Sequence, residues 1–75
     1  MNLYRITKTV RVMSPVAGVV IDVAADTIVR IDQDENPRAK FVLVEHATGR
    51  QLRGFRRDSE MNLWLDLNAE LIGDD

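Results

Sequence analysis

Residues 49–57, GRQLRGFRR, hold the side chains in this chain whose types and spacing best suit molecular recognition. They place four arginines and one phenylalanine within nine residues. Arginine pairs in a planar, bidentate manner with carboxylates and phosphates, and it stacks on aromatic rings. Such a segment can dock on a protein, or it can hold single-stranded nucleic acid. In a third interpretation these arginines are the solvated side of a small sheet, where exposed ion pairs contribute only about 0–1 kcal/mol each.

We predict a protein-docking face, because interface hot spots are rich in aromatic and arginine side chains. The candidate contact residues come from two neighbouring strands and the segment that follows them: Phe41, Leu43, Arg53, Phe55, Arg56, Arg57 and Trp64. Such a face would make the chain a non-catalytic binding module, for example a regulator or inhibitor of a larger assembly. Its partner would be another protein, and a homodimer is a second way of covering the face.

Binding of single-stranded RNA or DNA is the alternative function. Its candidate residues are arginines that could hold phosphates and one ring that could stack on a base: Arg5, Arg11, Arg50, Arg53, Phe55, Arg56 and Arg57. The net charge of −2 and the pI of about 5.3 argue against it, because nucleic-acid binders usually carry a basic excess. We therefore rank this function second.

Side chains suited to catalysis are few. His46 is the only histidine, and Ser14 and Ser59 are the only serines. Both serines fall at predicted turns, where hydroxyls commonly bond to nearby backbone. A nucleophile needs a base within hydrogen-bonding reach, and nothing in this spacing indicates such a pair. We predict that the chain is not an enzyme.

Metal and cofactor sites are not predicted either. The chain has no cysteine, which excludes thiolate sites and disulfides. The acidic residues of 32–36 have the spacing of a calcium loop, but Pro37 stands where that loop requires glycine and Leu43 where it requires glutamate. We interpret this segment as a solvated acidic loop.

The two signs of charge are separated along the chain. Residues 38–57 contain six of the ten basic side chains and a single acid, Glu45, whereas residues 58–75 contain six acids and no base. Eight of the ten basic residues are arginine. The C-terminal segment is thus a candidate ion-pair partner for the arginines of 50–57.

Apolar residues alternate with polar ones along most of the chain, which is typical of strands. In 3–13 one face carries Tyr4, Ile6, Val10 and Val12, and Lys8 interrupts it. Turns are predicted at 14–18, through Pro15 and Gly18, and in the polar loop 33–38. The predicted strands are 3–13, 19–24, 27–32, 39–46 and 50–56. Five or six short strands predict an all-β domain, either a small antiparallel barrel of the SH3-like or Sm-like kind or a small β-sandwich.

The predicted hairpin of 39–46 and 50–56 has a preferred register. A three-residue loop ending with Gly49 in the left-handed region pairs His46 with Arg50. It then pairs Glu45 with Gln51, Val44 with Leu52, Leu43 with Arg53, Val42 with Gly54 and Phe41 with Phe55. This register places Val42, Val44 and Leu52 on one face. A two-residue loop would mix charged and apolar residues on both faces, because a slip of one residue exchanges the faces.

The segment 61–72 allows two interpretations. Leu63, Leu67 and Leu71 are four residues apart, which suits a helix that begins near Ser59. Alternation of apolar and polar residues across 63–71 favours a strand instead. We prefer the strand and keep a short helix as the alternative.

The length of 75 residues allows a single domain, 1–75, with a small core. No apolar run is long enough to span a membrane, and the N-terminus lacks the apolar stretch of a signal peptide. We therefore expect a cytoplasmic protein, with a frayed C-terminus at 73–75.

Overall fold

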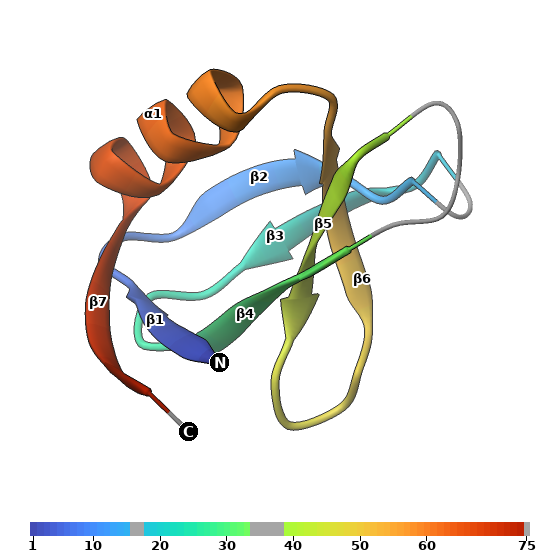
Figure 1. Ribbon diagram of the computed structural model, residues 1–75. Helices are drawn as coiled ribbons and strands as arrows, with labels where there is room; N and C mark the ends of the chain where they lie inside the picture. The colour runs from blue at the N-terminus through green and yellow to red at the C-terminus, as the bar shows by residue number, and fades with distance from the viewer. Residues whose placement is uncertain (16–17, 34–38, 75) are drawn as a thin grey trace.

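The computed structural model describes residues 1–15, 18–33 and 39–74, and Figure 1 shows their arrangement. These described residues form seven strands and one helix. In chain order these are β1 (Asn2–Ile6), β2 (Val10–Met13), β3 (Val20–Val23), β4 (Ile28–Gln33), β5 (Phe41–Glu45), β6 (Gln51–Phe55), α1 (Asp58–Asn68) and β7 (Ala69–Asp74). The strand order in the larger sheet is β6-β5-β4-β1-β7, and β2 and β3 pair separately.

The predicted strand 3–13 is two strands, β1 and β2, which belong to different sheets. β1 pairs with β4 and β2 pairs with β3, in one common antiparallel register: Tyr4 lies opposite Val29, and Val12 lies opposite Ile21. The two pairings therefore form one long hairpin that bends at residues 7–9. The exposed Lys8 lies at this bend, where the apolar face is interrupted in the sequence. Bending turns Val12 back onto the core beside Ile6.

The hairpin of β5 and β6 follows the predicted register only in part. Phe41 pairs with Phe55, Val42 with Gly54 and Leu43 with Arg53, as predicted. The register then shifts between Leu43 and Val44, so that Val44 lies opposite Gln51 and not Leu52. The predicted pairs Val44–Leu52, Glu45–Gln51 and His46–Arg50 are wrong. The shift is a local bulge, and it brings Leu52 into the core with Leu43 and Phe55.

The glycines of two predicted turns adopt the expected backbone. Gly49 has φ 76° and donates its N–H to the carbonyl of Glu45, and Gly18 has φ 63°. L side chains disfavour this left-handed region, which explains why glycine occupies both positions. Residues 16–17 of one predicted turn and 34–38 of the predicted polar loop lie outside the described residues.

The segment 61–72 is mainly helical, so the preferred strand is wrong there. α1 covers Asp58–Asn68, and a short strand, β7, follows at once and pairs antiparallel with β1. Met61, Trp64 and Leu65 recur at helical spacing and pack on the core. The negative charges of Asp58 and Glu60 in the first turn interact favourably with the helix dipole and stabilise the helix. Gly73 and Asp74, which we expected to fray, pair with β1; Asp75 lies outside the described residues.

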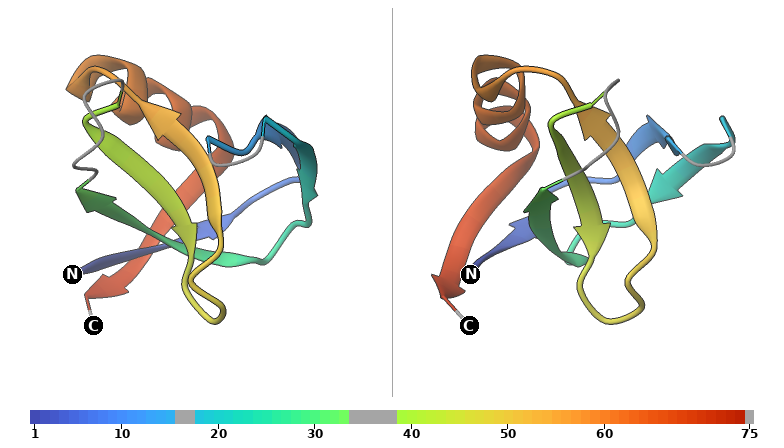
Figure 2. Two further views of the ribbon diagram at one scale, coloured as in Figure 1. Left: turned by 90° about the vertical axis from the view of Figure 1, so that its right-hand side faces the viewer. Right: turned by 45° about the vertical axis from the view of Figure 1, so that its right-hand side comes forward.

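The core lies between the five-stranded sheet, the β2–β3 ribbon and α1, as the two views of Figure 2 show. It consists of buried apolar side chains from all three parts: Ile6, Val12, Val23, Val29, Leu43, Leu52, Phe55 and Leu65. The structure confirms a small, mostly β domain. No ladder joins β2 to β6 in the part of the chain that the structure describes, so the predicted closed barrel is not confirmed. No helix of the described residues is long and apolar enough to cross a membrane.

Candidate functional site

Arg53, near the end of β6, is held by two aromatic rings. Its guanidinium carbon lies 4.7 Å from the ring centroid of Phe55 and 5.8 Å from that of Trp64. The two rings meet edge to face, with centroids 5.9 Å apart and an interplanar angle of 61°. Arg53 and Phe55 are two residues apart in a strand, so they share a face, and α1 brings Trp64 to the same place. Stacking of this kind orients a guanidinium without using its N–H donors.

The hydrogen-bond donors of Arg53 are left available by this arrangement. Among the described residues its nearest carboxylate is Glu60, whose Oε1 lies 3.9 Å from Nη2, which is within ion-pair range but too far for a hydrogen bond. Within residues 1–15, 18–33 and 39–74, no hydrogen bond involves the Arg53 guanidinium. Its side chain is 31% exposed. The arginine thus contacts two rings and keeps part of its side chain open to solvent.

A groove opens where β2 and β6 fail to pair. We call it the seam groove. It consists of two adjoining hollows, of about 650 and 370 Å³, which share Met13 and Arg53. The larger hollow is lined by Met13, Ser14, Pro15, Gly18, Ala39, Arg53, Gly54, Arg56 and Glu60. The smaller one is lined by Arg11, Val12, Met13, Val20, Arg53 and Trp64.

The rim of the seam groove on the β2–β3 side is apolar and open to water. Met13 is 61% exposed, and its cross-strand partner Val20 is 54% exposed. On the other side the lining includes Gly54, where an added Cβ would lie 3.3 Å from the Cβ of Ala39. Glycine therefore keeps the backbone of β6 close to its neighbours at this point.

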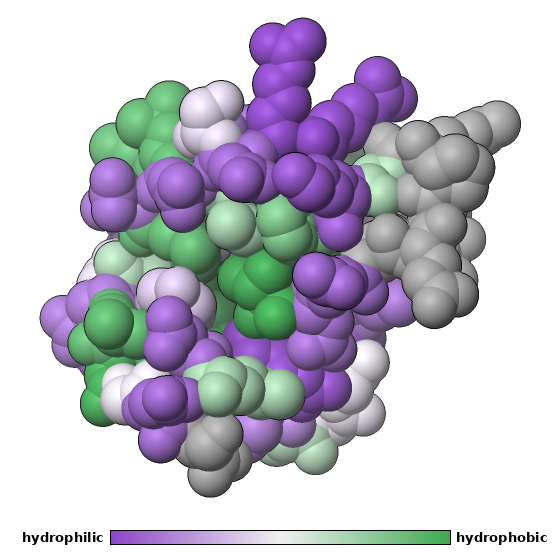
Figure 3. All heavy atoms as spheres, viewed as in Figure 1, coloured by the Kyte–Doolittle hydropathy of each residue, from purple (hydrophilic) through white to green (hydrophobic). Residues whose placement is uncertain are grey.

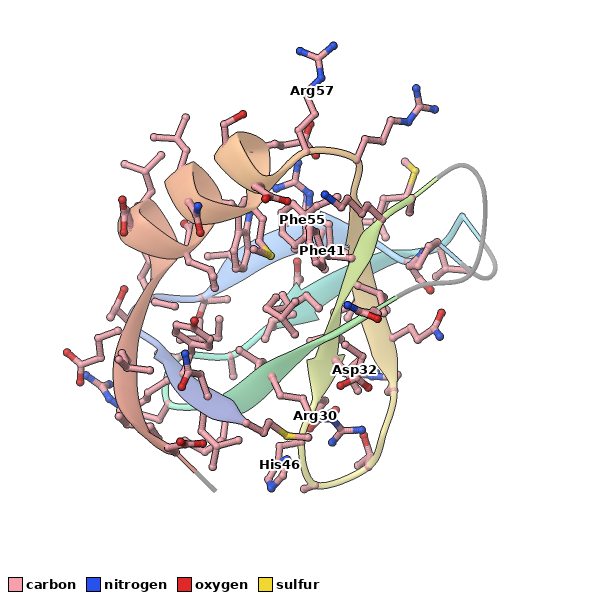
Figure 4. The ribbon with its side chains drawn as sticks, viewed as in Figure 1. Arg30, Asp32, Phe41, His46, Phe55 and Arg57 are labelled. Carbon is pink, nitrogen blue, oxygen red and sulfur yellow. The ribbon has the colours of Figure 1, made fainter. Side chains whose placement is uncertain are left out.

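The predicted docking residues divide into three groups. Leu43 and Phe55 are fully buried, so they offer no surface to a partner, and their place in the docking face is a wrong prediction. Their side chains are core because β2–β3 and α1 cover this face of the sheet. Phe41 is half-buried, and the ammonium of Lys40 lies 5.2 Å from its ring centroid. Figure 4 shows Phe41 and Phe55 close together inside the molecule, while Arg57 points away from it.

Three of the remaining predicted docking residues meet at the seam groove, and Arg57 does not. Arg53, Arg56 and Trp64 all contribute to its lining. Arg57, although adjacent to Arg56 in sequence, lines neither hollow and precedes α1 as its N-cap residue. The structure thus gathers three of the seven predicted docking residues and separates the other four.

The residues predicted for nucleic-acid binding are not gathered into one face. Arg5 donates hydrogen bonds to Glu70 of β7 and to Asp26, and these carboxylates raise the pKa of Arg5 above its ordinary value. Arg50 lies within ion-pair range of Glu45. Phe55 is buried and offers no ring face to a base. The stacking platform that this function needs is absent from these candidate residues.

Arg11 belongs both to that predicted set and to the lining of the smaller hollow. Its Nε donates to the Asp22 carboxylate across the β2–β3 ladder, at 2.9 Å. This hydrogen bond lowers the pKa of Asp22 below its ordinary value of 3.8 and raises that of Arg11. The charge of Arg11 is therefore largely engaged within the ribbon.

Sequence reasoning missed Met13, Val20 and Gly54. One signal was present for Met13. In the alternation of the strand it falls on the same face as Arg5, Thr7 and Arg11, so it is an apolar residue on a polar face. An apolar side chain at such a position is exposed unless another element covers it. Val20 and Gly54 have no comparable signal, because their role depends on which strands border the seam.

A polar cluster lies at the other end of the sheet, where Figure 4 shows Arg30, Asp32 and His46. Arg30 Nε donates to Asp32 at 3.1 Å, and its Nη1 donates to the His46 carbonyl at 3.1 Å. The bond from Arg30 to His46 links β4 to the residue that follows β5, so the cluster has a structural role. Among the described residues no group of three or more carboxylate or histidine side chains could hold a metal.

Comparison of the chain with family models, with curated proteins and with solved structures gives no match.

Proposed function

We propose that this chain is a non-catalytic protein-docking module that binds an extended segment of a partner protein in the seam groove. One observation carries the proposal: Arg53 is held by two aromatic rings between the exposed apolar rim of β2–β3 and the start of α1. Arginine, tryptophan and methionine are enriched at the energetic centres of interfaces. A pre-oriented arginine also loses less conformational entropy on binding than a free one does.

The shape of the seam groove favours an extended occupant. It lies between β2 and β6, each of which is paired on one side only within the described residues. A peptide in strand conformation can bond to such an edge through its main chain, while pockets along the groove receive alternate side chains. The hollow of about 650 Å³ has room for a few side chains of that kind.

The role that suits such a module is that of a regulator or inhibitor of a larger assembly, acting by occupancy and not by chemistry. A cytoplasmic location fits the same role and stays a prediction from the sequence. Binding of single-stranded nucleic acid has less support, because Phe55 is buried and Arg5 lies in ion pairs on another part of the molecule.

The experiment is a selection of random twelve-residue peptides displayed on phage against the immobilised chain. Selected peptides are then measured with two matched pairs of variants. Arg56→Glu alters the groove lining and Arg57→Glu does not; Met13→Ser alters the apolar rim and Val19→Ser removes a similarly exposed valine outside both hollows. We expect affinity to fall about tenfold for the groove variant of each pair, as for an interface hot spot, and to stay within twofold for its control.

Two outcomes would overturn the proposal. The first is a selection that yields no peptide sensitive to Arg56→Glu or Met13→Ser. The second is binding of single-stranded oligonucleotides that weakens steeply with salt and is lost in the same two variants. Thermal unfolding of every variant shows whether a loss of binding reflects a loss of fold.

A further inference from the structure

We propose that the seam groove recognises a carboxylate of the partner segment, which Arg53 takes as a bidentate pair, and that Glu60 is the internal carboxylate which the partner displaces. This inference rests on the proposed docking function and adds the chemical class of its key contact. The carboxylate belongs to an aspartate or glutamate side chain or to a free C-terminus, since all three present the same two oxygens.

The state of the Arg53 guanidinium points to an acceptor that arrives from outside. A guanidinium has five N–H donors in a fixed, planar fork. Here the guanidinium carbon lies 4.7 Å from the ring centroid of Phe55 and 5.8 Å from that of Trp64, and these ring contacts use none of its N–H donors. No acceptor in the described residues is hydrogen-bonded to these donors. A carboxylate matches the fork and gives short, charge-assisted hydrogen bonds.

Glu60 has the position of a competing ligand. It lines the same hollow as Arg53 and lies in the first turn of α1. Its Oε1 comes to 3.9 Å from Nη2, which is close enough for attraction but not for a hydrogen bond. The Glu60 side chain is about half exposed, so it can turn into solvent when another carboxylate arrives. The free chain thus keeps a weak internal pair that a well-oriented external carboxylate exchanges for a strong one.

The lining of the smaller hollow favours a carboxylate that is carried by a peptide. Beside Arg53 this hollow presents Val12, Met13, Val20 and Trp64, which suit the apolar neighbours of a carboxylate in a peptide, and Arg11, whose Nε is hydrogen-bonded to Asp22. The expected ligand is therefore an extended segment with one acidic residue between apolar ones.

The test uses a synthetic peptide array in which each peptide exists in two forms. One form carries Asp or Glu and a free C-terminus at chosen positions, and the other carries Asn or Gln and a C-terminal amide. The array includes the phage-selected peptides and the designed pair acetyl-Leu-Val-Glu-Val-Leu-amide and acetyl-Leu-Val-Gln-Val-Leu-amide. We expect the acidic form to bind at least about tenfold more tightly, as befits hydrogen bonds to a charged group.

Three variants locate the effect. Arg53→Gln should erase the preference for the acidic form, and Arg53→Lys should restore only part of it, because lysine keeps the charge but loses the fork. Glu60→Gln should strengthen binding of the acidic peptides about threefold or more, through removal of a competing charge, and leave the amide forms unchanged. A merely structural role of Glu60 would weaken both forms alike.

The outcomes separate this inference from the proposed function. Peptides that bind the groove, as judged by Met13→Ser and Arg56→Glu, but bind equally well in acidic and amide forms would overturn the inference and leave docking intact. An acidic preference that survives Arg53→Gln, or a Glu60→Gln variant that binds acidic peptides less tightly, would also overturn it. Absence of any groove-dependent peptide would remove both.

Discussion

The two edges of the five-stranded sheet carry similar apolar content and bury it differently. At the β6 edge, Leu52 and Phe55 are fully buried. At the β7 edge, Leu71 is 62% exposed and Ile72 is 46% exposed. Figure 3 shows apolar surface over α1 and β7 on one side of the molecule. The β2–β3 ribbon and α1 cover the sheet near β6, whereas β7 pairs with β1 and receives little cover of its own.

The two edges also differ in charge. Among the described residues, the groove beside β6 is lined by Arg53 and Arg56 with Glu60 as its one acid, while β7 and the helix before it contain acids and no base. The side chain of Arg5 in β1 forms an ion pair with Glu70 of β7, which adds a side-chain link between these two strands. The comparison teaches that cover by a neighbouring element, and not apolar content, decides whether an edge strand contributes to stability or to the surface.

The largest expected effect is the difference in stability between an alanine variant at Phe55 and one at Leu71. Phe55→Ala should lower the free energy of unfolding by about 3–5 kcal/mol, because it removes a buried ring and leaves a cavity. Leu71→Ala should change it by less than about 0.5 kcal/mol, as at an exposed site. Urea denaturation followed by circular dichroism measures both. Equal losses in the two variants would mean that the edges are covered alike.

The same contrast exists within α1, between leucines two residues apart. Leu65 is 5% exposed and Leu67 is 63% exposed. Leu65→Ala should lower the free energy of unfolding by about 2–4 kcal/mol. Leu67→Ala should leave it nearly unchanged, since alanine is an equally good helix former. Denaturation midpoints compare them. A large loss of stability in Leu67→Ala would indicate that Leu63, Leu67 and Leu71 face the core.

Glycines near the two edges should also respond differently. Gly49→Ala should destabilise the fold by about 1–2 kcal/mol, because φ 76° is unfavourable for an L side chain. Gly73→Ala has free space around its new Cβ and should be neutral or slightly stabilising, by up to about 0.5 kcal/mol, since glycine weakens a strand. Differential scanning calorimetry of both variants tests the pair, and a neutral Gly49→Ala would contradict the loop geometry.

The smallest effect concerns pH and the β2–β3 ribbon beside the groove. Arg11 holds the pKa of Asp22 below 3.8 in the folded chain. The stabilisation that follows is complete above the unfolded pKa and is lost as pH falls through the folded one. Melting temperatures of wild type and Asp22→Asn should differ slightly at pH 7 and converge as the pH falls through the folded pKa of Asp22. In an Arg11→Gln background the difference should be absent at every pH; its persistence would refute the pairing.

Several features of the fold follow from short stretches of sequence. Alternation predicts the strands of the sheet, and the position of Lys8 marks the point where one long strand bends. Gly49 sets the left-handed turn that joins β5 to β6, although the strand pairs next to that turn differ from the predicted ones because of the bulge. These features depend on backbone sterics and on contacts between residues close in sequence, which a local pattern can express.

Other features could not be inferred in this way. The bulge beside Val44 moves Leu52 to the core face, and no residue type in the hairpin marks it. The segment 61–72 satisfies both periodicities, and the core selects the helix by accepting Met61, Trp64 and Leu65. Half of the candidate site was predicted, through Arg53, Arg56 and Trp64. Met13, Val20 and Gly54 joined it only because β2 lies beside β6.

The sequence by itself determined a small, strand-rich domain, the hairpin that carries the arginines and the separation of basic from acidic segments. Tertiary structure alone decided which aromatic rings are buried, that Arg53 contacts the rings of Phe55 and Trp64, and that a groove remains open along the seam. The physical reason is range: turns and alternation act between neighbours in sequence, whereas burial depends on which distant element supplies cover.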